Sequence, residues 1–303
     1  MATQARSTPT PEQLVADLML LLDLEPRGSD LFIGRKHPEG MGRVFGGQAI
    51  AQALGAARRT VPAERFTHSL HAYFLRPGSD EHPIEFRVKR DLDGRSFSNR
   101  RVVASQRGEP ILNLTASFHL PQEGMGHQEA RMPQVPPPEE LRPDAEIRRE
   151  VAEQLPDGPL KRLMLRPRAI DFRSVETRDW LDPQKQAPMA HCWFRTVSQL
   201  PDYRPIHRAV LAYASDFQLL STAMNPHGLS MHLGQLKAAS LDHAIWFHDN
   251  FRADEWLLYV TDSPWSGMSR GFGRGQIFTQ DGRLVASVAQ EGMLRAVTGS
   301  VSA

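Results

Sequence analysis

The chain has 303 residues, of which 40% are hydrophobic and 23% charged, and its formal net charge is +1. This composition is typical of a globular protein with two ordinary domains or one large one. A charge so close to zero gives no general case for nucleic-acid binding. No stretch reaches the roughly 20 apolar residues that span a bilayer. We therefore expect neither nucleic acid nor a membrane among its partners.

Cysteine usage and the N-terminal segment predict a cytoplasmic location. Residues 1–13, MATQARSTPTPEQ, lack the apolar core of a secretory signal. Cys192 is the only cysteine, so the chain cannot form an internal disulfide, which fits a reducing compartment. Cys192 stands in the strand-like run HCWFR, and a free cysteine in such a run is usually buried. We expect it to pack in the core and not to act as a nucleophile.

The first half of the chain predicts two helices and a series of strands. An amphipathic helix is expected at 11–25, with Pro11 in its first turn. A buried helix rich in small residues is expected at 44–62. Stretches with β-branched and aromatic content, separated by turn residues, predict the strands. These strands are expected within 30–36, 68–78, 83–106 and 108–120.

A proline-rich stretch at 132–144 predicts a stiff linker, and a helix is expected after it at about 144–155. The second half then repeats the order of the first, with a helix-like run at 207–226. The match of His71-Ala72 to His243-Ala244 supports the repeat, and the match of Pro62 to Pro226 at the helix ends places Asp216 opposite Gln52, within a residue or two. Strands are expected within 169–176, 191–198, 240–250, 256–280 and 282–295.

One helix followed by antiparallel strands, occurring twice, predicts an α+β fold. We expect an N-terminal repeat at 1–125, a proline-rich linker and helix at 126–165, and a C-terminal repeat at 166–303. The two repeats are not expected to be independent, because a sheet wrapped on one helix leaves edges that the second copy can cover or pair.

Asp216 is the most informative residue, because it lies in the run HRAVLAYASDFQLL, which is apolar almost all round. A helix of that kind is normally buried. A carboxylate without partners there is costly, or holds a proton. A structural acid paired with an arginine or a backbone group remains an equal interpretation. The alternative is that the chain keeps the acid for chemistry.

Two further polar residues fall in apolar settings. Strand alternation in LVASVAQEG places Gln290 on one face with Ala286 and Val288. Ser240 stands at the start of the expected strand SLDHAIWFH. Alone, a serine there is most often a strand-edge hydroxyl, and a buried glutamine is often a satisfied core amide. Together with Asp216 they could hold a water molecule, with the acid as general base, the hydroxyl orienting the water and the amide donating a hydrogen bond.

Other motifs are weaker candidates for chemistry. Residues 267–271, GMSRG, fit the GxSxG pattern, but Pro264 precedes them and further glycines follow, which favours a hairpin over a nucleophile elbow. Asp242 and His243 are adjacent on a strand and should face opposite sides. Gly46-Gly47 could admit a substrate oxygen to a helix N-terminus, or could serve close packing. No metal-ligand spacing occurs, so no metal is expected.

Several segments, taken together, resemble the acyl-CoA thioesterase II family, which are tandem-hotdog hydrolases. The resemblance implies a double hotdog, in which an antiparallel sheet wraps a central helix in each repeat. It also implies that Asp216, Ser240 and Gln290 hold the hydrolytic water; Ser240 departs mildly from the threonine frequent at that position. These segments are VFGGQAIAQAL (44–54), HSLHAYFLRPG (68–78), LAYASDF (211–217), SLDHAIWFH (240–248) and LVASVAQEGMLR (284–295).

The resemblance predicts hydrolysis of medium- to long-chain acyl-CoA to free fatty acid and CoA, with no dissociable cofactor. A homo-oligomer is also expected, from sheet edges and family habit. One rival interpretation is a hotdog hydratase acting on enoyl-CoA, which is disfavoured because no histidine lies four or five residues beyond Asp216. Another is a non-catalytic acyl-CoA binding protein, which would have no need of a desolvated carboxylate.

Overall fold

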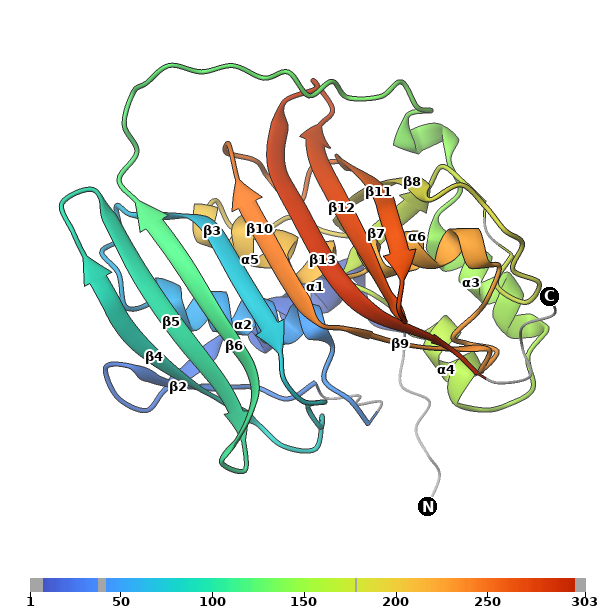
Figure 1. Ribbon diagram of the computed structural model, residues 1–303, viewed down its shortest axis with the longest axis horizontal. Helices are drawn as coiled ribbons and strands as arrows, with labels where there is room; N and C mark the ends of the chain where they lie inside the picture. The colour runs from blue at the N-terminus through green and yellow to red at the C-terminus, as the bar shows by residue number, and fades with distance from the viewer. Residues whose placement is uncertain (1–7, 38–41, 178, 298–303) are drawn as a thin grey trace.

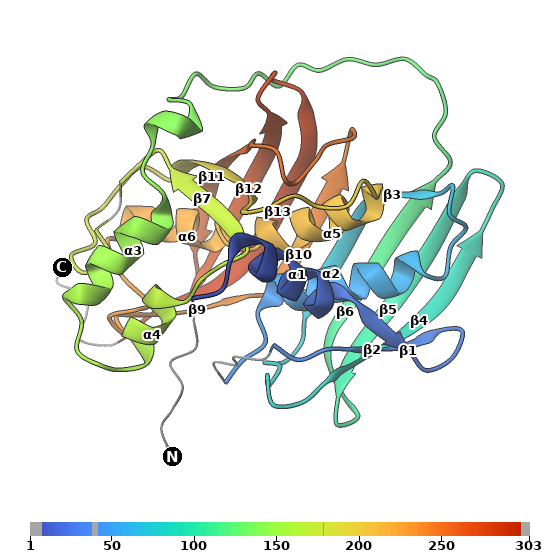
Figure 2. The same ribbon diagram turned by 180° about the vertical axis from the view of Figure 1, so that it is seen from behind.

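The computed structural model describes residues 8–37, 42–177 and 179–297. Its dominant feature is a single antiparallel sheet that continues through both halves of the chain. Figures 1 and 2 show this sheet from its two sides, with the helices of both halves gathered on one face. The sheet curves around those helices, so that the core lies between them and the strands.

In the first half, α1 (Pro11–Leu22) begins at a capping box in which Thr10 and Gln13 bond each other's backbone N–H groups. α2 (Gly46–Arg58) consists largely of alanine and glycine, and its small side chains let the strands approach it closely. The two helices predicted here are confirmed, each shorter than expected. The strands are β1 (Leu24–Pro26), β2 (Leu31–Gly34), β3 (Phe66–Phe74), β4 (Ile84–Asp93), β5 (Phe97–Gln106) and β6 (Glu109–His119).

The connection between the halves has no regular structure over residues 120–137 and crosses the ends of the strands (Figure 1). It leads into the short 3₁₀ helix η1 (Pro138–Glu140) and then α3 (Asp144–Glu153), which confirms the helix expected after the prolines. α4 (Pro159–Leu165) follows and was not predicted. α3 and α4 pack together beside the second half of the sheet (Figure 2).

The single helix predicted over 207–226 is broken in the structure. α5 (Arg204–Ser215) ends just before Asp216, and α6 (Leu219–Met224) begins after a turn at 216–218, followed by η2 (Asn225–His227). Leu219 and Leu220 therefore do not share a helical face with Asp216. The strands are β7 (Ile170–Ser174), β8 (Met189–Thr196), β9 (Leu236–Ser240), β10 (Asp242–Phe247), β11 (Leu257–Gly267), β12 (Arg270–Thr279) and β13 (Leu284–Ala296).

The two halves join where β3 pairs antiparallel with β10, and Leu70 lies opposite Ile245, both fully buried. One hydrophobic core then runs through both halves, and it includes Ile50 of α2 and Leu211 of α5. The α+β fold with an antiparallel sheet is confirmed. The strand order is β1-β2-β4-β5-β6-β3-β10-β13-β12-β11-β8-β7, and β9 pairs separately with β13.

The sequence match between His71 and His243 does not join equivalent positions. In the β3–β10 pair, His243 lies opposite Ala72, and both are buried on the helix side of the sheet. His71 lies opposite Ala244 and is exposed on the outer face. Since neighbouring strand residues face opposite sides, the alignment predicted from the histidines is wrong by one residue at this point.

Candidate active site

Asp216 lies at the C-cap of α5, beside the first turn of α2. Its Oδ2 atom accepts a hydrogen bond from the Gly47 backbone N–H at 2.8 Å. The first N–H groups of a helix have no partner within the helix, and the helix dipole favours negative charge at that end. The carboxylate of the second half is thus held by a helix terminus of the first half.

Two glycines make this close approach possible. A Cβ atom at Gly46 would lie 2.6 Å from Asp216 Oδ2, and one at Gly47 would lie 2.3 Å from the Tyr213 carbonyl oxygen. Neither position can therefore carry a side chain unless α2 and α5 move apart. Of the two interpretations of this glycine pair, close packing is confirmed, and the buried Gly47 N–H binds an acid of the chain itself.

The carboxyl group of Asp216 is enclosed although the residue as a whole is only partly buried. Its Oδ1 atom is shielded from solvent and has no hydrogen-bond partner among the described residues. Burial raises the pKa of Asp216 from its usual 3.8 to about 7, and the Gly47 N–H and the Gln290 amide offset part of that rise. A carboxyl with a pKa near neutrality is suited to general-base chemistry.

Ser240 and Gln290 are in direct contact. The Gln290 Nε2 donates to Ser240 Oγ at 2.6 Å, and Gln290 is only 2% exposed. Ser240 is the last residue of β9, not the start of the next strand as predicted, and it lies opposite Gly292 of β13. The structure therefore joins two of the predicted residues by a hydrogen bond. The third, Asp216, is close enough for the Gln290 amide to affect its pKa.

His243 belongs to the same group of side chains, although the sequence marked it only as a weak candidate beside Asp242. It is fully buried, and its Nδ1 lies 2.6 Å from Gln290 Oε1. Its Nε2 lies 2.9 Å from the hydroxyl of Ser215, the residue before Asp216. Asp242 faces the other way and accepts from the Glu291 N–H, as strand alternation predicts. Ile245 is buried, and side chains two residues apart on a strand face the same side. The sequence could therefore have predicted that His243 faces the core.

The weaker motifs have structural roles. Cys192 is buried, and burial raises the pKa of its thiol well above the usual value, so it remains protonated. Within GMSRG, Met268 and Ser269 both have positive φ and form the turn between β11 and β12. The expected hairpin is thereby confirmed. Among the described residues no cluster of histidine, cysteine and acidic side chains could hold a metal ion.

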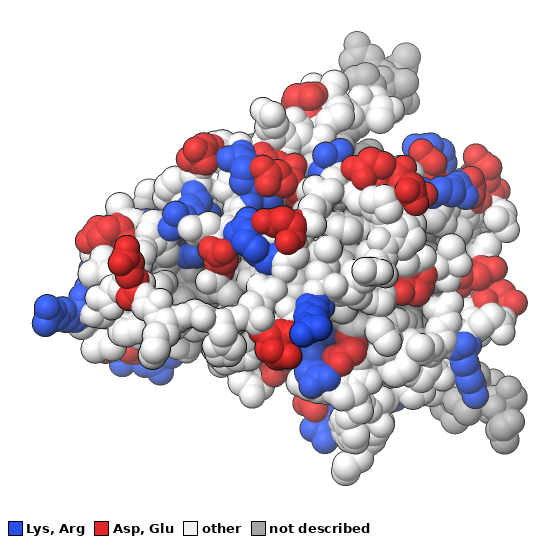
Figure 3. Space-filling model, turned by 90° about the horizontal axis from the view of Figure 1, so that it is seen from above, with Lys and Arg blue, Asp and Glu red and all other residues white. Residues whose placement is uncertain are grey.

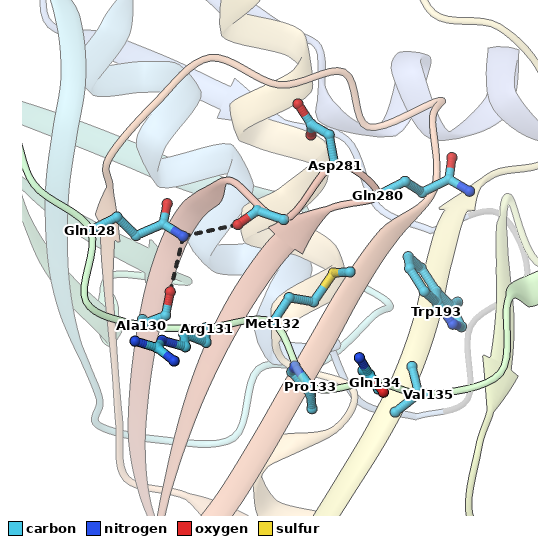
Figure 4. A pocket seen from close by; sticks show the side chains of 11 residues that line it. Gln128, Ala130, Arg131, Met132, Pro133, Gln134, Val135, Trp193, Gln280 and Asp281 are labelled. Atoms are coloured by element: carbon cyan, nitrogen blue, oxygen red, sulfur yellow. Dashed lines mark hydrogen bonds between the residues drawn. The ribbon is translucent and has the colours of Figure 1, made fainter.

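Two hollows lie in the second half. One, of about 290 Å³, is lined by Phe217 and Gln218, the two residues after Asp216, and lies between α6 and strands β7 and β8. Its wall combines apolar side chains, among them Phe172, Met224 and Leu229, with polar ones such as Glu176 and His191. The other, of about 600 Å³, is an open groove between the connection that joins the halves and the outer face of the sheet, beside Trp193 and Asp281 (Figure 4). Asp216, Ser240 and Gln290 line neither hollow.

The surface offers no extended area of one charge on the side shown in Figure 3, where acidic and basic side chains lie intermingled. Many of the arginines form ion pairs with neighbouring acids, as Arg274 does with Asp262. Within the described part of the chain, no helix has the length and apolarity to cross a bilayer.

Central helices wrapped by one antiparallel sheet, in two successive copies, define the double-hotdog class of fold. Comparison with known proteins agrees with this class. A protein from Alicyclobacillus acidocaldarius described as having a hot dog fold is 21% identical, with a TM-score of 0.71, over 92% of this chain and 98% of that one. That likeness shows the fold.

Closer relatives show the family. Residues 36–119 match the acyl-CoA thioesterase N-terminal domain, and residues 167–293 match the acyl-CoA thioesterase family. Acyl-CoA thioesterase 2 of Haemophilus influenzae is 37% identical over 93% of this chain and 98% of its own length. The acyl-CoA thioesterase II TesB2 of Mycobacterium marinum is 40% identical, with a TM-score of 0.75, over 93% of this chain and 99% of that one. The chain belongs to the acyl-CoA thioesterase family and is a thioester hydrolase.

Proposed function

We propose that the protein hydrolyses medium- to long-chain acyl-CoA to a free fatty acid and CoA, using a water held by Asp216, Ser240 and Gln290. The observation that carries the proposal is the enclosed Asp216 carboxyl, with its pKa near 7 and an unpartnered Oδ1, close to the hydrogen-bonded Gln290–Ser240 pair. A core acid kept only for packing would have partners for both carboxylate oxygens, whereas Asp216 has one at Oδ2 and none at Oδ1 among the described residues.

In the proposed reaction, ionised Asp216 takes a proton from the water through Oδ1 while the water oxygen attacks the thioester carbonyl carbon. The carbonyl oxygen becomes an oxyanion, and the Gln290 amide donates a hydrogen bond to the water or to that oxygen. The tetrahedral intermediate then expels the CoA thiolate, which takes the proton from Asp216. The carboxylate is regenerated, and no covalent enzyme intermediate is formed.

Ser240 orients the water in this scheme. Its oxygen already accepts from Gln290 Nε2, so its own O–H remains available to donate, and its second lone pair remains available for a water proton. Gly47 supplies a different kind of support, because its N–H stabilises the ionised form of Asp216. The proposed site therefore uses residues of both halves, although the reacting side chains all come from 166–303.

For the acyl chain we propose the cavity of about 290 Å³ that Phe217 lines. The apolar side chains of its wall suit a hydrocarbon chain, since such pockets bind mainly through burial of apolar surface. Replacing Leu229 by tryptophan narrows this cavity. We expect Leu229→Trp to lower kcat/KM for palmitoyl-CoA more than for hexanoyl-CoA, and an equal loss for both substrates would place the chain elsewhere.

The direct test of the proposal is thiol release from palmitoyl-CoA, followed with a thiol reagent. Wild-type protein should release CoA, and Asp216→Asn should not. Binding of palmitoyl-CoA without release by the wild type would favour the acyl-CoA binding protein. A series of substrates from acetyl- to palmitoyl-CoA then measures the chain-length preference.

A further inference from the structure

His243 is the only described histidine that contacts Gln290. It touches no proposed reacting atom other than this amide, and its second ring nitrogen contacts the Ser215 hydroxyl, at the end of α5. His243 therefore connects the strand that carries Gln290 with the helix end that carries Asp216. Tyr259 adds to this connection, because its O–H donates to the Ser215 carbonyl at 3.1 Å.

Complete burial lowers the pKa of His243 to about 4, so its ring is neutral and carries one N–H proton at neutral pH. Two proton arrangements satisfy the contacts. In the first, His243 Nδ1–H donates to Gln290 Oε1, and the Ser215 hydroxyl donates to His243 Nε2. In the second, the Gln290 amide is rotated, its NH₂ donates to Nδ1, and Nε2–H donates to Ser215, which can donate to the Ala212 carbonyl at 3.2 Å.

The two arrangements present opposite groups to the proposed site. The first turns the Gln290 NH₂ towards Ser240 and Asp216, where it meets an acceptor hydroxyl and a carboxylate. The second turns Oε1 towards the carboxylate, and two oxygen atoms carrying negative charge repel each other. The repulsion is stronger in an enclosed site than in water. The first arrangement is therefore favoured when Asp216 is ionised.

We propose that His243 is a positioning residue, which donates from Nδ1 to Gln290 Oε1 and so keeps the Gln290 amide with its NH₂ group facing the lytic water. This inference rests on the proposed function, in which Gln290 donates to the water or the thioester oxygen. Without the histidine, a terminal amide rotates between two orientations, of which only one donates into the site. The ring tautomer thus selects the chemically useful face of Gln290.

Two substitutions of His243 separate this role from simple core packing. In His243→Asn the side-chain nitrogen is bonded to Cγ, as Nδ1 is in histidine, so the donor to Gln290 is kept. In His243→Gln the amide lies one carbon further out, so it can reach Ser215 but no longer donates to Gln290 from the same place. We expect kcat of His243→Gln to fall by about 10- to 100-fold, as for other residues that orient a reacting group. KM should change little.

His243→Asn should keep most of kcat. Melting temperatures of the two variants show whether both are folded, and they also show whether their stabilities differ enough to matter. If both variants lose kcat equally at similar melting temperatures, His243 acts by packing and the inference is wrong.

A double-mutant cycle tests whether His243 acts through Gln290. We expect His243→Gln to lower kcat in the wild-type background and to cause no further loss in Gln290→Ala. Equal losses in both backgrounds would overturn the inference. A different result, wild-type activity in Gln290→Ala alone, would instead overturn the proposed function, so the two failures can be told apart.

The tautomer can also be observed without any variant. In wild-type protein labelled with ¹⁵N-histidine, the ring-nitrogen chemical shifts of His243 should show a protonated Nδ1 and an unprotonated Nε2 above pH 7. Protonation at Nε2 in that range would contradict the proposed orientation of the amide.

Discussion

The two halves wrap a helix in the same way, but the polar side chain at the helix–sheet interface is a fixed amide in the first half and an ionisable acid in the second. In the first half, Gln52 lies on α2, and its Nε2 donates to the carbonyl oxygens of Leu21 and Arg35 at 2.6 and 3.0 Å. α1 and the adjoining strands pack over it, and Gln52 is fully buried. The amide thus links α2 to the end of α1 by hydrogen bonds, within the packed core of the first half.

The second half has a cavity beside its helices. α3 and α4 stand further along the sheet, and this cavity, of about 290 Å³, lies between them and α6. The helix is interrupted at 216–218, next to that cavity. A continuous helix would carry Asp216 in the middle of a packed face. The break instead places its carboxyl at a helix end, against Gly47.

The cross-strand pairs show the same contrast. In the first half Ala72 lies opposite Leu114, and both are buried apolar residues. The corresponding partners in the second half are His243 and Gln290, which are joined by a hydrogen bond.

β3 runs through Ser69 and Leu70, whereas β9 ends at Ser240 and β10 begins at Asp242. A single backbone framework therefore serves as a packed core in one half and as a polar site in the other.

The largest effect should come from Asp216, an acid for which the first half has the amide Gln52. Asp216→Asn keeps the shape of the side chain and removes the base, so we expect kcat for palmitoyl-CoA to fall by roughly 10²- to 10⁴-fold. The rate of thiol release at saturating substrate measures kcat. The matched substitution in the first half is Gln52→Met, which removes the amide at similar volume. It should lower the melting temperature and leave kcat unchanged.

The contrast between the halves would be broken if Gln52→Met lowered kcat as far as Asp216→Asn did while the protein remained folded. The reacting group would then not be confined to the second half.

The second effect concerns the cross-strand pairs. Gln290→Met keeps the volume and removes the donor, and we expect kcat to fall by roughly 10²- to 10³-fold, the usual cost of one oxyanion donor. Leu114→Ala at the corresponding place should cost about 2–5 kcal/mol of unfolding free energy and leave kcat nearly unchanged. Urea unfolding and steady-state kinetics on both variants measure the two quantities. A Gln290→Met variant that is destabilised but fully active would make this amide a structural one.

Much of the fold could be predicted from sequence, because β-branched and aromatic runs, turn residues and apolar stripes act locally. The same local reasoning marked Asp216 as out of place and set Gln290 on the core face. The break after Ser215 could not be predicted, and the group that binds Asp216 there, the Gly47 N–H, lies far away in the sequence. The role of His243 was also missed, because its partners come from a different strand and a different helix.

The internal repeat of the sequence led to one wrong prediction, the alignment of the two strands that join the halves. His71-Ala72 and His243-Ala244 are identical in sequence, but successive residues of a strand face opposite sides of the sheet. Shifting the alignment by one residue therefore matches a buried residue with an exposed one. Sequence similarity within a repeat does not detect such a shift. The irregularity at Leu241, between β9 and β10, is the local feature that accompanies it.

A third experiment tests whether the first half contributes to the site through the start of α2. A methyl group added at Gly46 would lie 2.6 Å from Asp216 Oδ2, so Gly46→Ala must move the carboxylate. A displacement of about 1 Å can cost up to 10²-fold in rate, and we expect kcat to fall by roughly 10-fold or more.

Gly55→Ala is the control on the same helix. Its Cβ would make ordinary contact with Leu24 at 3.7 Å, and alanine should stabilise the helix by about 0.5–1 kcal/mol. This variant should be as active as the wild type. Unimpaired activity in Gly46→Ala would show that the position of the acid does not depend on α2.

The dependence of activity on pH is a smaller effect, and it has a definite sign. The pKa of Asp216 is raised to about 7, and the base must be ionised to accept a proton. We therefore expect kcat/KM to rise about tenfold per pH unit below 7 and to level off above it. His243 cannot account for this limb, because its pKa is lowered to about 4. A profile flat between pH 5 and 8 would exclude Asp216 as the base.

The smallest effect is on stability, and it too distinguishes the second half from the first. The folded protein holds the Asp216 proton up to about pH 7, whereas the unfolded chain releases it near pH 3.8. The contribution of this group to the unfolding free energy is complete below the unfolded pKa and is lost as the pH rises through 7. An asparagine side chain has no such proton to lose, so Asp216→Asn should gain melting temperature over the wild type as the pH rises from 5 to 8.5.

Each kcal/mol of this gain should raise the melting temperature by roughly 1.5–2 °C, and scanning calorimetry at several pH values can resolve it. The difference between variant and wild type is the informative quantity, since the other titrating groups are common to both and cancel. In Gln52→Met, which replaces a group that does not titrate, the difference should be independent of pH. A gain for Asp216→Asn that is largest at pH 5 would mean that the folded state stabilises the ionised carboxylate, and a base with a raised pKa would then be ruled out.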